Sequence, residues 1–385
     1  MIFAELRFLV LFAACWGCFF ALPRNWRPSV LAFWGAVFYL TYAGPFLCVV
    51  LVLVGLVHSA GRRPWAWAAG ITTIALLGYF KLTLRASPLP ATGTIPSELL
   101  IPLGFSYLAF ELLHLVIERQ SGRIRDLRLA DLLAFAFFAP ARIAGPIKRF
   151  PDFTAAVQAA TLSGANVYAG ILRVLIGFAK KLMVADVLAL TVAERSYVGS
   201  PRHAWTIVLA FSLQIYFDFS AYSDIAIGFA RLLGIELPEN FQRPYLASNI
   251  REFWNRWHIT LSHWVRDYVF LPTARALFNT RLRRRPPAIA VFSYLVAFLA
   301  VGAWHGATAA FLVWGLYHGV LLSLFHLVRL KTPAWITDHP LYRSSMAQMF
   351  SVAVTFACVT LGWVPFMLPL KEARKLLALM FGARA

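Results

Sequence analysis

The chain is built from long apolar stretches that are separated by short polar connections. Each stretch approaches the about 20 residues that a membrane-spanning helix needs, and Val30–Val57 holds no charged residue at all. The predicted spans are 3–21, 29–41, 43–60, 65–85, 98–117, 129–146, 165–192, 204–232, 288–303, 307–329 and 346–369. They predict an all-α polytopic integral membrane protein with about nine to eleven passes, some of them re-entrant or broken.

The composition indicates the same environment for the whole chain. Of its 385 residues, 60% are hydrophobic and 14% are charged, whereas a water-soluble chain carries about 25% charged residues. No polar segment is long enough to form an aqueous domain, so we expect one integral membrane domain over 1–385. Within it, we assign 1–95 to scaffold helices, 96–330 to the functional core, and 331–385 to a C-terminal helix and tail.

The net charge of +19 lies in short basic clusters between the apolar runs. Basic residues in short loops hold those loops on the cytoplasmic side of a membrane and attract anionic lipid headgroups. The clusters are Arg62-Arg63, then Arg119, Arg123, Arg125 and Arg128, then Lys180-Lys181, and finally Arg281, Arg283, Arg284 and Arg285. We therefore expect membrane lipids, and no nucleic acid, as partners of these clusters.

Two patterns near the N-terminus have ordinary explanations. Cys15-Trp16-Gly17-Cys18 is formally a C-x-x-C, but it lies within an apolar run with no second pair or histidine cluster nearby, so we expect helix packing and neither a disulfide nor a metal site. Met1–Phe20 lacks a basic leader and a small-residue cleavage site, which favours a first membrane helix over a signal peptide.

From about residue 100 onward, polar side chains appear inside the apolar stretches. Four of them are spaced at three and four residues, which places them on one helix face that must look into protein or water rather than lipid. They are Tyr107, Glu111, His114 and Glu118. The Pro- and Gly-rich stretch 88–96 predicts an exposed loop before them. The broken apolar run 140–150 predicts the rim of an internal chamber or a membrane surface.

Further polar residues cluster between 214 and 272. Asp218, Ser223 and Asp224 lie inside an apolar helix, where we expect them to serve a hydrogen-bond network or the structure. Charges, tryptophans and histidines then alternate over 249–268, a segment that includes Asn255, Arg256, Trp257 and His258. An amphipathic helix in the membrane interface accounts for the tryptophans and arginines there, but not for His258 among residues suited to a buried network.

A second histidine lies in the apolar run that contains Ala303-Trp304-His305-Gly306, and His318 follows on the same helical run. Ionisable groups at membrane depth are costly, so each is a candidate for a reaction centre or a transport path. The simpler alternative is that such a histidine forms a hydrogen bond between helices.

These motifs together resemble the membrane-bound O-acyltransferase family, and specifically its bacterial branch that serves alginate O-acetylation and D-alanyl transfer in teichoic acid synthesis. The resemblance covers roughly residues 100–330. It rests on LGFSYLAFE at 103–111, AGPIKRF at 144–150, FDFSAYSDIAIG at 217–228, PENFQRPY at 238–245, REFWNRWHITLSHWVRDYVFLP at 251–272 and AWHGATAAFLVWGLYHG at 303–319.

The resemblance implies a helical fold around a central tunnel or funnel, with the acyl donor presented from the cytoplasm and the acceptor hydroxyl reached from outside. It implies that His305 is the catalytic residue and that His258 is its companion near the reaction centre. Residues that would bind substrate or support the site are Trp304, Asn255, Trp257, Arg256, Asp218, Ser223, Asp224 and His318. For His318, packing against Trp314 is an equal alternative.

The chemistry of acyl transfer makes these roles sensible. Attack of a hydroxyl on a thioester requires removal of the hydroxyl proton, for which an imidazole such as His305 is suited. His258 would orient the acceptor or donate a hydrogen bond to the developing oxyanion. No cofactor is expected to stay bound, because acetyl-CoA or an acyl-carrier thioester would act as substrate.

The favoured function is an O-acyltransferase of the bacterial cytoplasmic (inner) membrane that moves an acetyl group for modification of an exported polysaccharide. The runner-up transfers D-alanine from a carrier-protein thioester to a cell-wall polymer. A polysaccharide-precursor transporter and a purely structural membrane subunit are alternatives of other classes. The expected partners of the favoured enzyme are a cytoplasmic thioester donor and an extracytoplasmic, SGNH-hydrolase-like protein that accepts the acyl group.

Overall fold

The computed structural model describes residues 2–60, 66–86, 104–194, 199–306, 308–333, 339 and 344–383. Within these ranges the chain forms helices and no strand, which confirms the predicted all-α class. Four of the described helices are long and apolar enough to cross a membrane: α11 (Pro201–Leu232), α15 (Pro286–His305), α16 (Ala309–Lys331) and α19 (Ser345–Met367). The predicted loop at 88–96 and the Arg62-Arg63 cluster lie outside the described residues.

Contacts divide the chain into two compact units, and the division falls inside α11. The first unit comprises the residues up to Ala179 together with Ala221–Pro238. Besides the end of α11, its helices are α1 (Leu6–Ala21), α2 (Arg27–Ala43), α3 (Phe46–Ala60), α4 (Ala66–Ala86), α5 (Phe105–Gln120), α6 (Leu129–Phe137), α7 (Ala139–Arg142), α8 (Phe150–Ala159) and α9 (Gly164–Ala179), with short 3₁₀ turns at Ile2–Ala4 and Arg24–Trp26.

The second unit comprises Lys180–Ser220 and the chain from Glu239 onward. It contains the first part of α11 and the long helices α15, α16 and α19. Its other elements are a π-helical turn at Lys180–Ala185, α10 (Asp186–Ala193), a 3₁₀ turn at Pro244–Leu246, α12 (Ile250–Arg256), α13 (Ile259–Val265), a π-helical turn at Arg266–Phe270, α14 (Leu271–Phe278), the 3₁₀ turn η8 (Arg281–Arg284) and α20 (Leu370–Met380). The predicted division at 95/96 and 330/331 remains a prediction.

Two predicted spans are interrupted in the structure. The span predicted over 129–146 is broken into pieces: α6 ends at Phe137, because Pro140 lacks the N–H that would bond to the carbonyl of Ala136, and no helix continues from α7 through Gly145 and Pro146. The span predicted over 165–192 is divided into α9 and α10 by the π-helical turn that begins at Lys180. The other described spans follow the predicted ranges to within a few residues.

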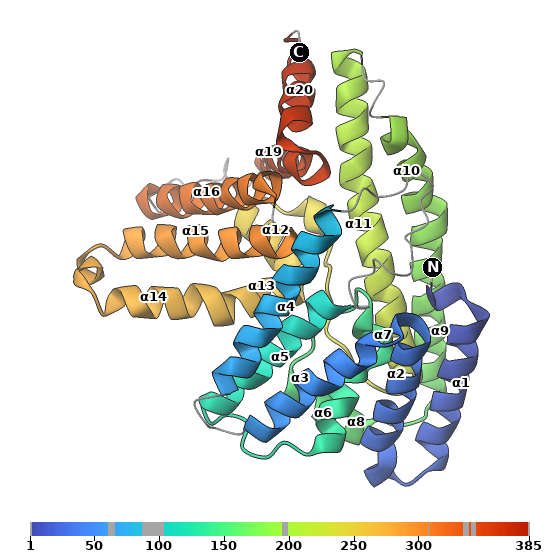
Figure 1. Cartoon of the computed structure of the whole chain (residues 1–385). Helices are drawn as coiled ribbons and strands as arrows, with labels where there is room; N and C mark the ends of the chain where they lie inside the picture. The colour runs from blue at the N-terminus through green and yellow to red at the C-terminus, as the bar shows by residue number, and fades with distance from the viewer. Residues whose placement is uncertain are drawn as a thin grey trace. The chain divides into compact units, whose positions relative to one another are not determined.

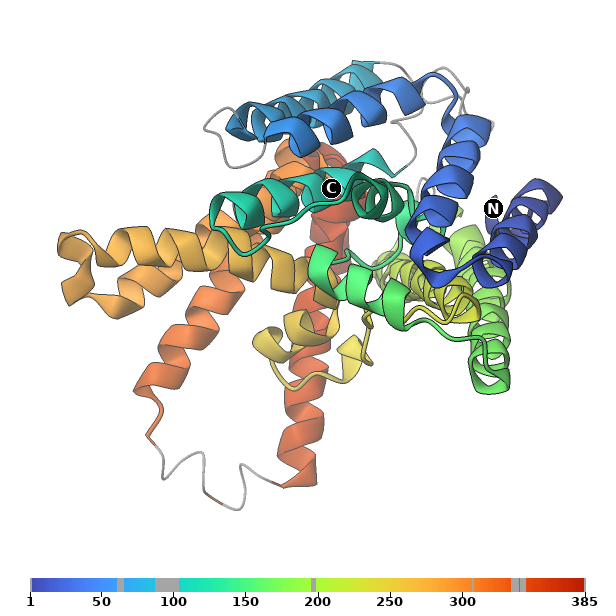
Figure 2. The same ribbon diagram turned by 90° about the horizontal axis from the view of Figure 1, so that it is seen from below.

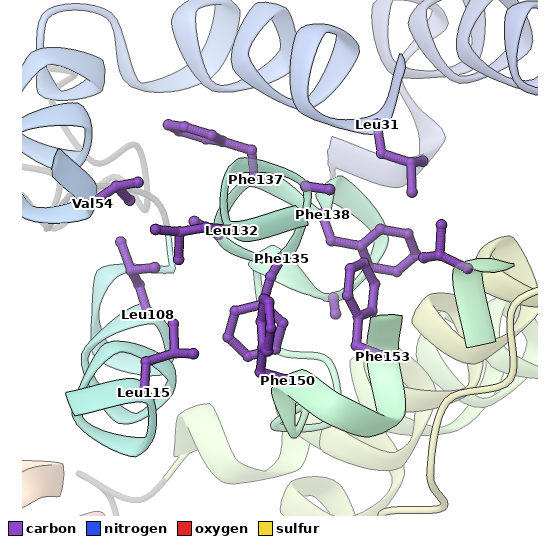
Figure 3. Packing of buried hydrophobic residues seen from close by; sticks show 14 of the residues in the cluster. Leu31, Val54, Leu108, Leu115, Leu132, Phe135, Phe137, Phe138, Phe150 and Phe153 are labelled. Carbon is purple, nitrogen blue, oxygen red and sulfur yellow. The ribbon is translucent and has the colours of Figure 1, made fainter. Parts of the chain in front are cut away.

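The core of the first unit is aromatic. Figure 3 shows Phe135 of α6 beside Phe150 and Phe153 of α8, with Leu108 and Leu115 of α5 nearby. The ring of Phe135 lies 5.4 Å from that of Phe150 and 5.6 Å from that of Phe153, at the steep angles that favour edge-to-face contact. This core fixes α5, α6 and α8 relative to one another.

A buried carboxylate ties the broken run 140–150 to α5. Glu111 accepts a hydrogen bond of 2.9 Å from Arg142 Nη2 and a second bond from Lys148 Nζ, and each of these three side chains is only 1% exposed. The ammonium group of Lys148 also lies 5.0 Å from the centre of the Phe135 ring, a cation–π distance. The polar face predicted on this helix therefore looks into protein, and the run 140–150 is packed inside the first unit.

In the second unit, α15 and α16 approach each other backbone to backbone. A Cβ atom on Gly302 would lie 2.4 Å from the carbonyl oxygen of Phe311, and one on Gly315 would lie 2.3 Å from that of Phe298. Only glycine permits such contact, which is the usual way in which small residues bring membrane helices together. Figures 1 and 2 show α14 lying beside α15, with η8 at the turn between them.

We predict that Glu111→Gln destabilises the protein strongly, because it leaves two buried cations without their anion. Breaking a buried ion pair costs about 3–5 kcal/mol, which should lower the midpoint of thermal unfolding in detergent. The matched control is Glu236→Gln, which removes the exposed ion pair between Glu236 and Arg231 and should cost less than about 1 kcal/mol. Equal losses in the two variants would show that Glu111 does not hold this unit together.

The arginines of η8 predict the sidedness of the α14–α15 connection. Arg281, Arg283 and Arg284 are exposed in a short turn beside an apolar helix, and such a turn resists translocation. A cysteine placed at the exposed Asn279, in a background lacking the four native cysteines, should react with an impermeant maleimide only from the cytoplasmic side. Labelling from outside intact cells would show that the α14–α15 connection lies on the opposite side of the membrane from the one predicted.

Candidate active site

His258 lies at a sharp break between α12 and α13. Its φ angle is 41°, in the left-handed region that residues other than glycine rarely adopt. An L-residue pays about 1–2 kcal/mol for this conformation, and such outliers persist where the surrounding structure over-determines them. The segment 249–268 is therefore not the continuous interfacial helix that was one expectation from its tryptophans and arginines.

A single residue, Asn240, holds this break through its side-chain and backbone oxygens. Asn240 is fully buried, and its Oδ1 atom accepts hydrogen bonds from Thr260 Oγ1 at 2.9 Å and from the Thr260 backbone N–H at 3.3 Å. The backbone carbonyl of Asn240 accepts a further bond of 3.0 Å from the N–H of Ile259. The same Oδ1 atom lies 3.0 Å from Nδ1 of His258.

These contacts determine the tautomer of His258. The N–H of Thr260 identifies the bonded side-chain atom of Asn240 as its oxygen, which only accepts, so Nδ1 of His258 must carry the proton. His258 lies outside the candidate spanning helices, and burial lowers its pKa from 6.5 to about 3. The imidazole is therefore neutral at ordinary pH, and its Nε2 atom is a hydrogen-bond acceptor.

His305 is the last residue of α15, and its side chain is half-buried. Its ring lies 4.6 Å from that of Trp304, 5.1 Å from that of Trp314 and 4.9 Å from that of Phe366. The next residue must be small, because a Cβ on Gly306 would lie 2.6 Å from the Phe311 ring. The sequence pattern did not predict that Phe366, a residue of α19, would contact the imidazole of His305.

The prediction that His305 and His318 share one helical run is wrong. The chain leaves the helix at Gly306, and a new helix begins where the Thr308 hydroxyl accepts a hydrogen bond of 3.1 Å from the N–H of Phe311. His318 is fully buried in α16, where its ring lies 5.2 Å from Trp314 and 5.1 Å from Trp254. Among the described residues, neither nitrogen of His318 has a hydrogen-bond partner.

The two histidines of the predicted centre belong to one aromatic cluster of the second unit. From His258 the ring contacts run through Phe219 and Phe241 to Trp257, then through Trp363 and Trp314 to His305, at centroid distances from 4.7 to 6.1 Å. Trp257, Trp304 and His318 were predicted to support the site, and the structure places them in this cluster. The cluster also contains residues that the sequence did not single out, namely Phe219, Phe241, Trp363 and Phe366.

The remaining predicted site residues lie elsewhere. Arg256 forms an ion pair with Glu252, one helical turn away on α12, and so stabilises that short helix. Asp218 pairs with Lys181 at 2.7 Å in the second unit. Asp224 pairs with Arg173 at 2.6 Å, and this pair and the buried Ser223 belong to the first unit. Both carboxylates are thus neutralised by cations, as a structural role requires.

Asn255 borders a cavity of about 190 Å³ within the second unit, hereafter the α12–α15 cavity. Its polar side is lined by Arg251, Asn255, Ser262, His263 and Arg266, and its apolar side includes Trp254, Phe298 and Val301. Trp254 and Phe298 also contact the ring of His318, so this cavity adjoins the aromatic cluster. Among the described residues, no group of histidine, cysteine or acidic side chains has the arrangement of a metal site.

Comparison with known proteins places the chain among relatives of one family. The sequence profile of the membrane-bound O-acyltransferase family matches residues 95–361. The chain is 32% identical over 410 residues to a probable alginate O-acetylase of Pseudomonas putida, covering 100% of this chain and 80% of that protein. It is 32% identical over 391 residues to a probable alginate O-acetylase of Azotobacter vinelandii, covering 95% and 75%. A teichoic acid D-alanyltransferase of Bacillus subtilis is 29% identical over 284 residues, covering 70% of each chain.

The neutral, buried His258 predicts a pH dependence of stability. Its folded-state pKa lies below the unfolded value, so the unfolded chain binds the extra proton and stability falls as the pH drops below about 6.5. His258→Asn tolerates the left-handed backbone and keeps a donor for Asn240, but it does not titrate. Between pH 7 and pH 5 the wild type should lose about 2 kcal/mol more than this variant. A wild-type slope in His258→Asn would contradict the buried neutral imidazole.

Proposed function

The chain belongs to the membrane-bound O-acyltransferase family, and on that premise we propose that it moves an acetyl group from a cytoplasmic thioester donor across the membrane to a hydroxyl acceptor, for modification of an exported polysaccharide. As a member of this family it is a multi-pass membrane protein and an acyltransferase, which replaces the alternatives of a transporter and a structural subunit. We place it in the bacterial inner membrane.

The observation that carries this proposal is the position of His305. The imidazole ends a membrane-length helix, is half-buried, and is surrounded by the rings of Trp304, Trp314 and Phe366. A partly exposed imidazole can receive a proton from an approaching hydroxyl as that hydroxyl attacks the thioester carbonyl. The aromatic walls keep bulk water, the competing nucleophile, away from the thioester.

His258, in the same aromatic cluster, would act as a positioning residue. Because Nδ1 donates to Asn240, only the Nε2 lone pair can face a substrate, and a lone pair accepts a hydrogen bond. Of the two roles expected for His258, orienting an acceptor hydroxyl fits this tautomer, whereas donation to an oxyanion does not. The oxyanion would then be stabilised by other donors.

Our choice of acetyl as the acyl group rests on the names of the relatives. Two relatives with 32% identity, covering 95% or more of this chain, are named as probable alginate O-acetylases, whereas the D-alanyltransferase of Bacillus subtilis covers 70% of it. A relative in Helicobacter pylori, 29% identical over 360 residues, is named as a peptidoglycan O-acetyltransferase. These names favour acetyl transfer to a polysaccharide, and D-alanyl transfer to a teichoic-acid-type polymer is the second candidate.

Partners on both faces would complete the reaction. The exposed arginines of η8 attract the phosphate and carboxylate groups of coenzyme A or of a carrier protein. At the outer mouth, an SGNH-hydrolase-like protein with its own nucleophile would take the acyl group and pass it to the polymer. Anionic lipids would surround the basic loops.

We predict that His305→Ala abolishes transfer because the base is lost, while the protein still inserts and purifies normally, since the side chain is half-exposed at the end of α15. The expected fall in rate is about 100-fold or more, the usual contribution of a general base. Purified protein in nanodiscs is given radiolabelled acetyl-CoA and a candidate outer partner, and label on that partner is counted.

The matched control is His203→Ala, which removes a half-exposed histidine near the start of α11 and should leave transfer unchanged. Near-normal labelling by well-folded His305→Ala would exclude it as the base. Acetylation of free polymer at the full rate without a partner would exclude transfer through an SGNH-hydrolase-like protein. Activity with a D-alanyl carrier protein alone as donor would establish the second candidate.

A further inference from the structure

A polar pocket of about 460 Å³ lies in the first unit and is hereafter called the α6–α8 pocket. Its described lining residues all belong to that unit, whereas His258 and His305 belong to the second. Three elements form the pocket: Asn25 comes from the turn Arg24–Trp26, Arg128 and Asp131 lie at the start of α6, and Thr154, Ala155 and Gln158 lie on α8. The helix α2 begins directly after that turn and contacts both α6 and α8, so packing within the first unit fixes the walls of the pocket.

The pocket holds one cation and one anion that do not form a hydrogen bond with each other. Arg128 Nε lies 3.7 Å from Asp131 Oδ2, which is beyond hydrogen-bond distance. The side chain of Asp131 is only 14% exposed, yet no group in the part of the chain that the structure describes donates a hydrogen bond to it. A carboxylate that is largely shielded from water needs a donor. The guanidinium group of Arg128 is mostly exposed, so it too can contact a ligand in the pocket.

Amide and hydroxyl groups complete the polar lining. The side chains of Asn25 and Gln158 are exposed, and among the described residues neither amide has a hydrogen-bond partner. Thr154 donates its hydroxyl proton to the backbone of its own helix, at 3.0 Å from the carbonyl oxygen of Phe150, so its hydroxyl oxygen can accept. The lining therefore offers donors for an anion and acceptors for an ammonium group.

Exposed apolar side chains border this polar lining. Trp26 follows Asn25 in the sequence and is 56% exposed, and Leu129 follows Arg128 and is 47% exposed. In a membrane protein, tryptophan is enriched where the hydrocarbon meets the headgroups. A lipid whose headgroup fills the pocket could lay its acyl chains against these side chains. This combination favours a lipid over a water-soluble ligand.

We propose that the α6–α8 pocket binds the headgroup of a phospholipid that carries a primary amine, such as phosphatidylethanolamine. The phosphate lies at Arg128, because a guanidinium group binds phosphate through paired charge-assisted hydrogen bonds. The ammonium group lies at Asp131 and donates the hydrogen bonds that this carboxylate lacks. Only an ethylene link separates the two charges of this headgroup, which suits a cation and an anion that lie side by side.

Asp131 makes the pocket selective. The quaternary ammonium of phosphatidylcholine has no N–H to donate to the carboxylate. Phosphatidylglycerol has no ammonium at all, so its phosphate would meet the negative charge of Asp131 without compensation. The pocket therefore discriminates among lipids by the group beyond the phosphate. Its occupation is separate from acyl transfer and does not rest on the proposed function.

The experiment uses the full chain in a maltoside detergent and offers it the three phospholipids with identical acyl chains. Native mass spectrometry measures which lipid is retained in competition, and the wild type should retain phosphatidylethanolamine over the other two. Asp131→Asn should lower the preference for phosphatidylethanolamine over phosphatidylcholine at least about tenfold. The matched control is Asp126→Asn, which changes an exposed acid in the loop before α6 that does not line the pocket, and it should keep the preference.

A second variant tests the phosphate. Arg128→Gln should weaken retention of phosphatidylethanolamine and phosphatidylcholine alike, because both carry the phosphate, whereas Arg125→Gln at an exposed position outside the pocket should weaken neither. Size-exclusion chromatography and the unfolding midpoint report folding. Equal retention of the two lipids by the wild type, or an unchanged preference in well-folded Asp131→Asn, would overturn the proposal. His305→Ala should keep the wild-type preference, so failure of the catalytic assignment would be distinguishable from failure of this site.

Discussion

The site depends on the amide oxygen of Asn240. In an apolar surrounding, a backbone that leaves a regular helix must find partners for its N–H groups within the protein, because water is not at hand. Asn240 supplies them for Ile259 and Thr260 and at the same time accepts from the side chain of His258. Asn240 thus supplies the acceptors for the backbone N–H groups at the break, stabilises the left-handed conformation of His258 and selects the tautomer of its imidazole.

Charged side chains in the apolar part of the protein likewise find their partners within the protein. Glu111, Asp218 and Asp224 each face at least one cation at hydrogen-bond distance. The π-helical turn that begins at Lys180 displaces the helix locally, and Lys181 within it contacts both Asp186 and Asp218. Such turns are typical of helices that must aim a side chain away from its regular direction. The carboxylates of the FDFSAYSD motif therefore join elements within their units.

Much of the fold could be predicted from the sequence, because apolar length and periodicity are local properties. The ranges of α11, α15, α16 and α19, and the buried polar face of α5, follow from them directly. The break at His258 could not be predicted, since its cause is Asn240, which lies 18 residues away. Asn240 lies within the quoted PENFQRPY motif, and that motif was its only signal. Nothing in the sequence marks Phe366 and Trp363 as members of the cluster, because an aromatic residue in a membrane helix packs against many kinds of neighbour.

The contact of Gly302 with Phe311 and of Gly315 with Phe298 makes α15 and α16 a single rigid body at the end where His305 lies. Helices whose backbones touch cannot slide or rotate past one another without a clash of main-chain atoms. In the proposed mechanism, His305 therefore stays fixed relative to α16 while the substrates move. The donor's reach to this fixed imidazole would then set the selectivity among acyl groups.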